Sequence, residues 1–155
     1  MTALLPFLCD PTKRLKSNYH IAEKIYFSQV RKLQKAEKDR ADVISAFKKL
    51  IDMNFITKLT DLSEGEQNAI NSSEVKYFIP WTAVWNNNSV TTPCRPVFNA
   101  SCATDTGNSL NDLLPKGRNS LNKLCHIIIR WRAHLSAFHT DVQKMYNTIK
   151  LDPRH

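Results

Sequence analysis

Apolar residues recur at helical spacing in two stretches of the first third of the chain. The first stretch predicts a helix near residues 19–36, with apolar positions at Ile21, Ile25, Val30 and Leu33. The second stretch has one apolar stripe, formed by Val43, Ile44, Phe47, Leu50 and Ile51. Because neither glycine nor proline occurs in residues 12–62, helix is favoured throughout. A helical hairpin is expected, although one bent helix satisfies the same pattern.

The segments that flank this helical pair carry different signals. Residues 1–16 contain two prolines and a basic cluster, which predicts an extended lead-in. Asn18, just before the first helix, is the expected N-cap. After the second helix, the polar run at residues 62–68 predicts a surface connection.

The pattern then changes to one that is typical of a β-hairpin. Aromatic and β-branched residues are frequent in residues 75–85, and a polar turn follows at residues 86–89. The return strand is expected within residues 90–99. Pro93 and Pro96 remove two backbone donors from that strand, which favours an edge strand or an irregular one.

The last third of the chain predicts one helix and one strand. Ser120 is the expected cap of the helix, whose predicted buried face consists of Leu121, Leu124, Cys125 and Ile128. Residues 137–141 are predicted to form a short strand, and residues 142–149 can form a helical turn after it. Asp141 is therefore expected at a strand-to-helix junction.

Together these elements predict an α+β fold without internal repeats. Residues 1–62 are expected to form an N-terminal helical lead-in. Residues 63–155 are expected to form the remainder, with a small antiparallel sheet, a helix and a lone strand. Since a lone strand leaves backbone donors and acceptors unpaired, we expect it to need a further polypeptide.

The 155-residue chain has 22 lysines and arginines against 14 acidic residues, for a formal net charge of +8. This excess favours an acidic polymer as a partner, with a solvated basic face as the alternative. The four cysteines form no Cys-x-x-Cys pair, which argues against a structural zinc site. Because no secretory signal and no apolar run of about 20 residues is present, a cytoplasmic protein without a membrane segment is expected.

Two sets of side chains are candidates for function, and each has a structural alternative. Asp141, at the end of a core strand, is suited to hold magnesium. The same aspartate before a helical turn can instead accept backbone N–H groups as a cap. Trp81 and Trp85 can stack on a nucleic-acid base or form the core of the hairpin.

The second half of the chain contains four ordered motifs. They are Tyr77-Phe78-Ile79-Pro80, Thr91-Thr92-Pro93-Cys94-Arg95-Pro96-Val97-Phe98-Asn99-Ala100-Ser101, Ser109-Leu110-Asn111-Asp112, and Ala137-Phe138-His139-Thr140-Asp141. This series resembles the BEL/Pao reverse transcriptases. Members of that group typically have a Tyr-hydrophobic-Pro opening, a Thr-Thr-x-x-Arg strand ending in Val-Phe-Asp-Ala-Ser, a Ser-Leu-Asn-Asp segment, and a strand ending in aspartate. The helix at residues 124–131 and Lys144-Met145-Tyr146 also look like the corresponding family segments.

The resemblance implies the fingers and the start of the palm of a retrotransposon RNA-directed DNA polymerase. Asp141 then corresponds to the first palm aspartate, which binds Mg²⁺, and the backbone carbonyl of Val142 completes that metal site. Tyr146 corresponds to the aromatic residue that excludes a ribose 2′-hydroxyl. Arg95 corresponds to the arginine over the incoming triphosphate. The implied partners are an RNA or DNA template–primer, a deoxynucleotide and the rest of the Pol polypeptide.

The chain departs from the family pattern in three respects. Asn99 stands where the family usually has aspartate, and Pro93 stands where many relatives have lysine. The family's paired aspartates of the Tyr-x-Asp-Asp type are expected beyond residue 155, and because two-metal catalysis needs them, this chain alone is expected to be inactive. A catalytically inactive nucleic-acid-binding remnant, or an adopted transposon fragment, is the alternative. The resemblance implies an intracellular setting, which includes virus-like particles.

Overall fold

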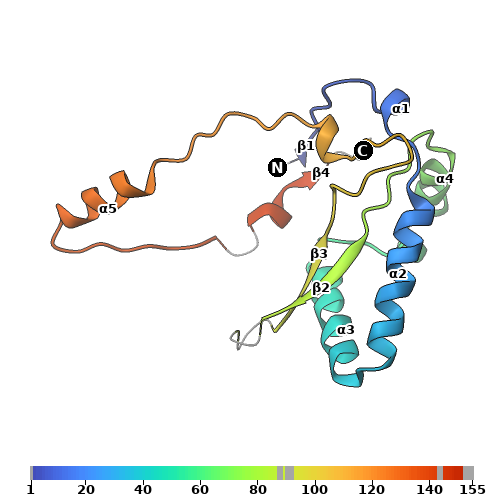
Figure 1. The fold of residues 1–155 in the computed structure, drawn as a ribbon, viewed down its shortest axis with the longest axis horizontal. Helices are drawn as coiled ribbons and strands as arrows, with labels where there is room; N and C mark the ends of the chain where they lie inside the picture. The colour runs from blue at the N-terminus through green and yellow to red at the C-terminus, as the bar shows by residue number, and fades with distance from the viewer. Residues whose placement is uncertain (1, 87–88, 90–92, 143–144, 152–155) are drawn as a thin grey trace. The chain divides into compact units, whose positions relative to one another are not determined.

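The computed structural model describes residues 2–86, 89, 93–142 and 145–151 (Figure 1). The chain divides into two compact units. The larger unit comprises Pro6–Leu114, and the smaller unit comprises Met1–Leu5 together with Pro115–His155. The described residues contain both helices and short strands, so the predicted α+β class is confirmed.

Two long helices follow one another in the larger unit. α2 spans Tyr19–Gln34 and α3 spans Glu37–Asp52, which confirms the predicted helical pair (Figure 1). Only two residues separate them, and the chain reverses direction there. Val43 and Leu50 lie seven residues apart on α3 and are both buried, as expected for one face of an amphipathic helix.

The segment before α2 is more structured than the extended lead-in that the sequence predicts. A short helix, α1, spans Pro11–Arg14, and the Asp10 carboxylate caps it by accepting the Thr12 N–H at 3.0 Å. Asn18 occupies the N-cap position of α2 but makes no side-chain capping bond. Its amide is fully buried and pairs instead with the backbone of Phe78, 60 residues further along the chain.

A helix replaces the surface connection predicted at residues 62–68. The 3₁₀ turn η1, Leu59–Asp61, leads into α4, which spans Glu64–Ser72. The Ser63 hydroxyl accepts the Glu66 N–H, and the Glu66 carboxylate accepts the Ser63 N–H at 2.9 Å. This reciprocal capping box satisfies two backbone donors that the start of a helix otherwise leaves unpaired.

The predicted hairpin is confirmed, with shorter strands. β2 spans Trp81–Trp85 and pairs antiparallel with β3, Cys94–Phe98. The stretch at residues 75–79 is not a strand, because the Phe78 backbone bonds to the Asn18 side chain rather than to a neighbouring strand. Residues 87–88 and 90–92, which include part of the predicted turn and return strand, lie outside the described residues.

Part of the core of the larger unit lies between α3 and the hairpin, which lie side by side in Figure 1. The Phe47 ring on α3 makes an edge-to-face contact with Trp81 at 4.8 Å between centroids, and a second with Phe98 at 6.2 Å. The buried apolar side chains are Leu15, Val43, Leu50, Cys94, Cys102 and Leu113. Leu113 ends the short 3₁₀ helix η2, Asn111–Leu113.

The smaller unit contains one helix, one 3₁₀ turn and a short parallel strand pair within the described residues. β1, Thr2–Ala3, pairs with β4, Lys150–Leu151. α5 spans Leu124–Arg132, and η3 spans Met145–Thr148. None of the helices in the described ranges combines the length and the apolar content that crossing a bilayer requires.

Three sequence predictions for this unit are wrong. Ser120 does not cap α5, because Asn119 accepts the Leu121 N–H in a local turn and the helix begins only after Lys123. The predicted buried face of α5 is exposed, with Leu124 at 69%. Residues 137–141 form neither strand nor helix. A strand needs a hydrogen-bonded neighbour, and in the described part of this unit the sole pairing is that of β1 with β4.

Candidate functional site

Three of the four family-like motifs meet in the larger unit. The Tyr77 hydroxyl, from the first motif, lies within hydrogen-bond distance of the carbonyl oxygens of Ala100, at 3.1 Å, and Cys102. Burial raises the pKa of Tyr77, which keeps its hydroxyl protonated as a donor. The first motif is thereby tied to the end of the second.

The second and third motifs are joined in the same way. The Asn111 side chain donates to the Ser101 hydroxyl at 2.8 Å, and the Asn111 N–H donates to the Ala100 carbonyl at 3.2 Å. Within the third motif, the Asp112 carboxylate accepts the Ser109 hydroxyl at 2.6 Å and the Ser109 N–H at 2.9 Å. Both hydrogen bonds lower the pKa of Asp112, and the bond from the Ser109 hydroxyl has the larger effect.

Asn99, the departure from the family's aspartate, keeps a local structural role. Its side-chain oxygen accepts the Ser101 N–H at 3.0 Å, which an aspartate would also do. The side chains of Tyr77, Asn99, Asn111 and Asp112 are therefore engaged by hydrogen bonds within these motifs. They fix the chain after β3, and Arg95 is the residue of these three motifs to which the resemblance assigns a role in chemistry.

Arg95 lies on the exposed side of the hairpin. It pairs with Val84, whereas Trp81 pairs with Phe98. Because side chains alternate along a strand, Arg95 points away from the face that α3 covers. Val84 and Val97 on the same side are also exposed. Within the described ranges, Arg95 has no carboxylate partner and no side-chain hydrogen bond, so its guanidinium is available to a ligand.

The other residues implied by the resemblance belong to the smaller unit. Asp141 and Val142 lie in irregular chain and are exposed, Val142 at 60%. Tyr146 lies in η3, and 80% of it is exposed. Within the described residues, no three His, Cys, Asp or Glu side chains cluster as metal ligands would. Thr91, Thr92 and Lys144, which also belong to matched segments, lie outside the described residues.

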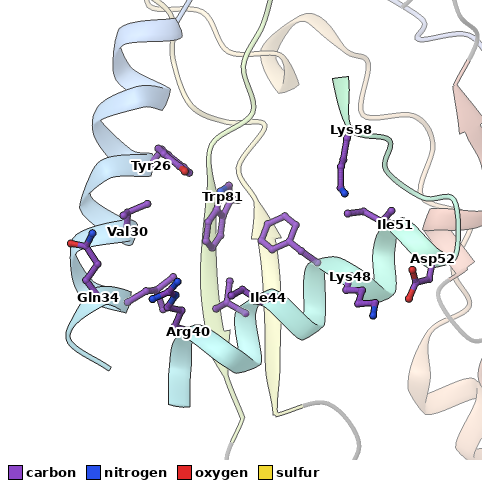
Figure 2. A pocket seen from close by; sticks show the side chains of 13 residues that line it. Tyr26, Val30, Gln34, Arg40, Ile44, Lys48, Ile51, Asp52, Lys58 and Trp81 are labelled. Carbon is purple, nitrogen blue, oxygen red and sulfur yellow. The ribbon is translucent and has the colours of Figure 1, made fainter. Parts of the chain in front are cut away.

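Sequence reasoning missed a hollow of about 680 Å³ among α2, α3 and β2 (Figure 2). Its walls are mainly apolar and include Tyr26 on α2, Phe47 on α3 and Trp81 on β2. Lys58, from the segment after α3, extends toward Ile51 in the hollow (Figure 2). The apolar positions of α2 and α3 that line it follow from their helical spacing, but the packing of β2 against both helices joins segments about 30 residues or more apart, which no local pattern reveals.

Comparison with known proteins returned no match to a family model, to a curated protein or to a solved structure.

Proposed function

We propose that the chain is part of an RNA-directed DNA polymerase of the BEL/Pao type, to which it contributes the nucleotide-contacting fingers and the first metal-binding aspartate. The observation that carries the proposal is an arginine on the outer face of a β-hairpin that has neither an ion-pair partner nor a side-chain hydrogen bond among the described residues. That arginine, Arg95, lies within the longest of the four family-like motifs. The contacts among Tyr77, Ala100, Ser101 and Asn111 support it, because they join motifs that the resemblance treats as one series.

The chemistry of Arg95 suits a triphosphate. Its guanidinium stays charged and offers a planar fork of donors that matches phosphate oxygens. The hairpin fixes the backbone of Arg95, while the exposed side chain remains free to reach a ligand. Val84 and Val97 lie on the same face and are exposed, so the approach to Arg95 is open on this side.

Asp141 and Val142 provide oxygen donors of the kind that Mg²⁺ prefers. A carboxylate and a backbone carbonyl fit a hard cation, which usually keeps several waters and takes further ligands from substrate phosphates. When bound, the metal would neutralise charge on the transferring phosphoryl group. The Asp141 side chain is exposed, so it is accessible to such a ligand. Tyr146 would contribute its exposed ring beside the sugar.

The test is binding of a deoxynucleoside triphosphate with Mg²⁺ to the full chain, in the presence of a primer–template, followed by NMR titration. Arg95→Ala should weaken triphosphate binding by about tenfold or more, since hydrogen bonds to charged groups are worth about 1.5–3 kcal/mol. Arg95→Lys should bind the triphosphate with an affinity between those of the wild type and Arg95→Ala, because lysine keeps the positive charge but lacks the forked pair of donors. Arg31→Ala on α2 removes the same charge from another exposed position and should bind like the wild type.

Two outcomes would contradict the proposal. Equal weakening by Arg95→Ala and Arg31→Ala would show that only net charge matters. No binding of the triphosphate at low salt would remove the nucleotide-contacting role altogether.

A nucleic-acid-binding remnant without turnover is the second candidate. The observation in its favour is the unpaired basic charge: among the described lysines and arginines, Lys13 alone forms an ion pair, with Asp10 at 3.9 Å. This candidate predicts primer–template binding that weakens steeply with salt and no selective effect of Arg95→Ala on the triphosphate. The same titrations therefore separate the two candidates.

A further inference from the structure

The hollow among α2, α3 and β2 has the size and lining of a ligand site. Its volume of about 680 Å³ lies within the range of pockets that hold small ligands. Figure 2 shows its side chains coming from both long helices, from β2 and from the segment after α3. All of these elements belong to the larger unit.

Aromatic rings form a large part of the wall. Trp81 and Phe47 meet edge to face at 4.8 Å between centroids, with an interplanar angle of 75°, and both line the hollow. Tyr26 lines it from α2 and is half exposed. A flat, unsaturated group can stack on such rings whatever its hydrogen-bonding pattern, as nucleobases do in single-strand channels.

Cations surround the same hollow. Arg40, Lys48 and Lys58 line it, against one carboxylate, that of Asp52. Within the described residues, none of these three cations has an ion-pair partner. A ligand with one or more negative charges beside its flat group would therefore be favoured over a neutral one.

A second hollow shares two of these walls. It has a volume of about 330 Å³, and Tyr26 and Trp81 line both hollows. Tyr19, Phe27 and Phe78 add further rings to the second. One carboxylate, that of Glu23, also lines the second hollow, and no lysine or arginine does, so the cations lie at the first hollow. A phosphate is therefore expected at the first hollow, while the rings of the second can contact only an uncharged, flat part of a ligand.

The hollows lie on the opposite side of the hairpin from Arg95. Trp81 and Val84 are three positions apart on β2, so their side chains project from opposite faces. Arg95 pairs with Val84, while the Phe47 ring covers the Trp81 side. A ligand in the hollows would be separate from a triphosphate held at Arg95, and the hollows are a site to which neither proposed function assigns a ligand.

We propose that this aromatic pocket, formed by Tyr26, Phe47, Trp81 and Lys58, binds a nucleotide unit of single-stranded nucleic acid. The base lies against the aromatic rings. The phosphate lies at the rim beside Lys58, whereas Arg40 lies at the other end of the hollow, near Gln34 (Figure 2). The site recognises a base with its phosphate and has no built-in selectivity for sequence, because stacking accepts every base.

The test uses fluorescence anisotropy of a short labelled oligodeoxythymidylate with the full chain at several salt concentrations. Lys58→Gln should weaken binding and lower the slope of log K against log salt by about 0.7, the value for one lost contact on a single strand. Lys24→Gln removes an equal charge from an exposed position on α2 outside both hollows and should leave the slope unchanged. Tyr26→Leu should weaken binding about tenfold, while Tyr26→Phe keeps the ring and the affinity.

Competition identifies the ligand chemistry. Unlabelled oligodeoxythymidylate should displace the probe most effectively, thymidine monophosphate less so, and inorganic phosphate at matched ionic strength hardly at all. Displacement by phosphate as effective as by the oligonucleotide would reduce the site to a general anion site and overturn the proposal. Equal losses in Lys58→Gln and Lys24→Gln, or unchanged binding in Tyr26→Leu, would also overturn it.

A parallel titration keeps this proposal separate from the polymerase role. The deoxynucleoside triphosphate titration is repeated with Lys58→Gln, whose exposed side chain contributes little to the core. Loss of oligonucleotide binding with triphosphate binding intact supports the pocket, whatever the outcome for Arg95. Loss of both would indicate a general charge effect and would refute the pocket.

Discussion

Asn18→Ala is the substitution that most directly tests how the larger unit is held together. The Asn18 side chain donates to the Phe78 carbonyl at 2.7 Å and accepts the Phe78 N–H at 2.8 Å. Asn18 is fully buried at the start of α2, and Phe78 precedes the hairpin. The Asn18 side-chain amide therefore pairs with both backbone polar groups of Phe78, as a neighbouring strand would, just before β2.

The expected cost follows from these two hydrogen bonds. Each contributes about 0.5–1.5 kcal/mol net, and leaving a buried backbone group without a partner costs about 1–3 kcal/mol. Water can reach part of the Phe78 backbone in the variant, because Phe78 itself is partly exposed. We therefore expect Asn18→Ala to lower the free energy of unfolding of the larger unit by about 2 kcal/mol.

Urea unfolding followed by circular dichroism measures this loss, and hydrogen exchange at the Phe78 amide locates it. Asn68→Ala on α4 is the matched control, because Asn68 is exposed and its side chain makes no hydrogen bond within the described structure. The control should change stability by less than about 0.5 kcal/mol. If Asn18→Ala were as mild as the control, or left the Phe78 amide protected from exchange, the argument would be refuted.

Two further predictions concern the family-like motifs. Tyr77→Phe removes the donor to the carbonyls of Ala100 and Cys102 and should cost about 1 kcal/mol in urea unfolding, and an unchanged midpoint would contradict it. Ser109→Ala should return the pKa of Asp112 toward its ordinary value of 3.8 in a carboxyl NMR titration. The pKa of Asp112 is lower in the folded chain than in the unfolded chain, so its ionised carboxylate stabilises the fold above the unfolded pKa. This stabilisation is lost as the pH falls through the folded pKa. Ser109→Ala should therefore make the free energy of unfolding fall less steeply at acid pH.

The parts of the fold that the sequence predicts are those formed by neighbours along the chain. α2 and α3 follow from periodicity, and β2 and β3 follow from strand-forming residues on either side of a polar run. The bond between Asn18 and Phe78 spans 60 residues, so no local window contains both partners. It also explains why the first part of the predicted strand is absent, since its backbone already has a side-chain partner.

α4 was within reach of sequence analysis. Ser63 and Glu66 have the spacing of a capping box, and this signal normally marks the start of a helix. Gly65 and the polar composition favoured a loop instead. The capping chemistry, rather than the polar composition, therefore determines the local structure here.

The predicted strand at residues 137–141 failed for a different reason. Its first residues are apolar, and a local pattern of that kind does not reveal whether a neighbouring strand exists. In the described part of the smaller unit, the paired strands are β1 and β4, and neither pairs with these residues. Asp141 remains the candidate metal ligand by resemblance, and a strand there would require a hydrogen-bonded neighbour that the described residues of this unit do not supply.

Both proposed sites depend on the same register of one hairpin. The pairing of Trp81 with Phe98 and of Val84 with Arg95 puts the aromatic pocket on the face toward α3 and the guanidinium on the outer face. A slip of one residue in either strand would exchange that strand's inner and outer side chains. Because Phe47 contacts both Trp81 and Phe98, the packing of α3 opposes such a slip. The Phe47 contacts therefore maintain the arrangement in which the two ligands can bind on opposite faces.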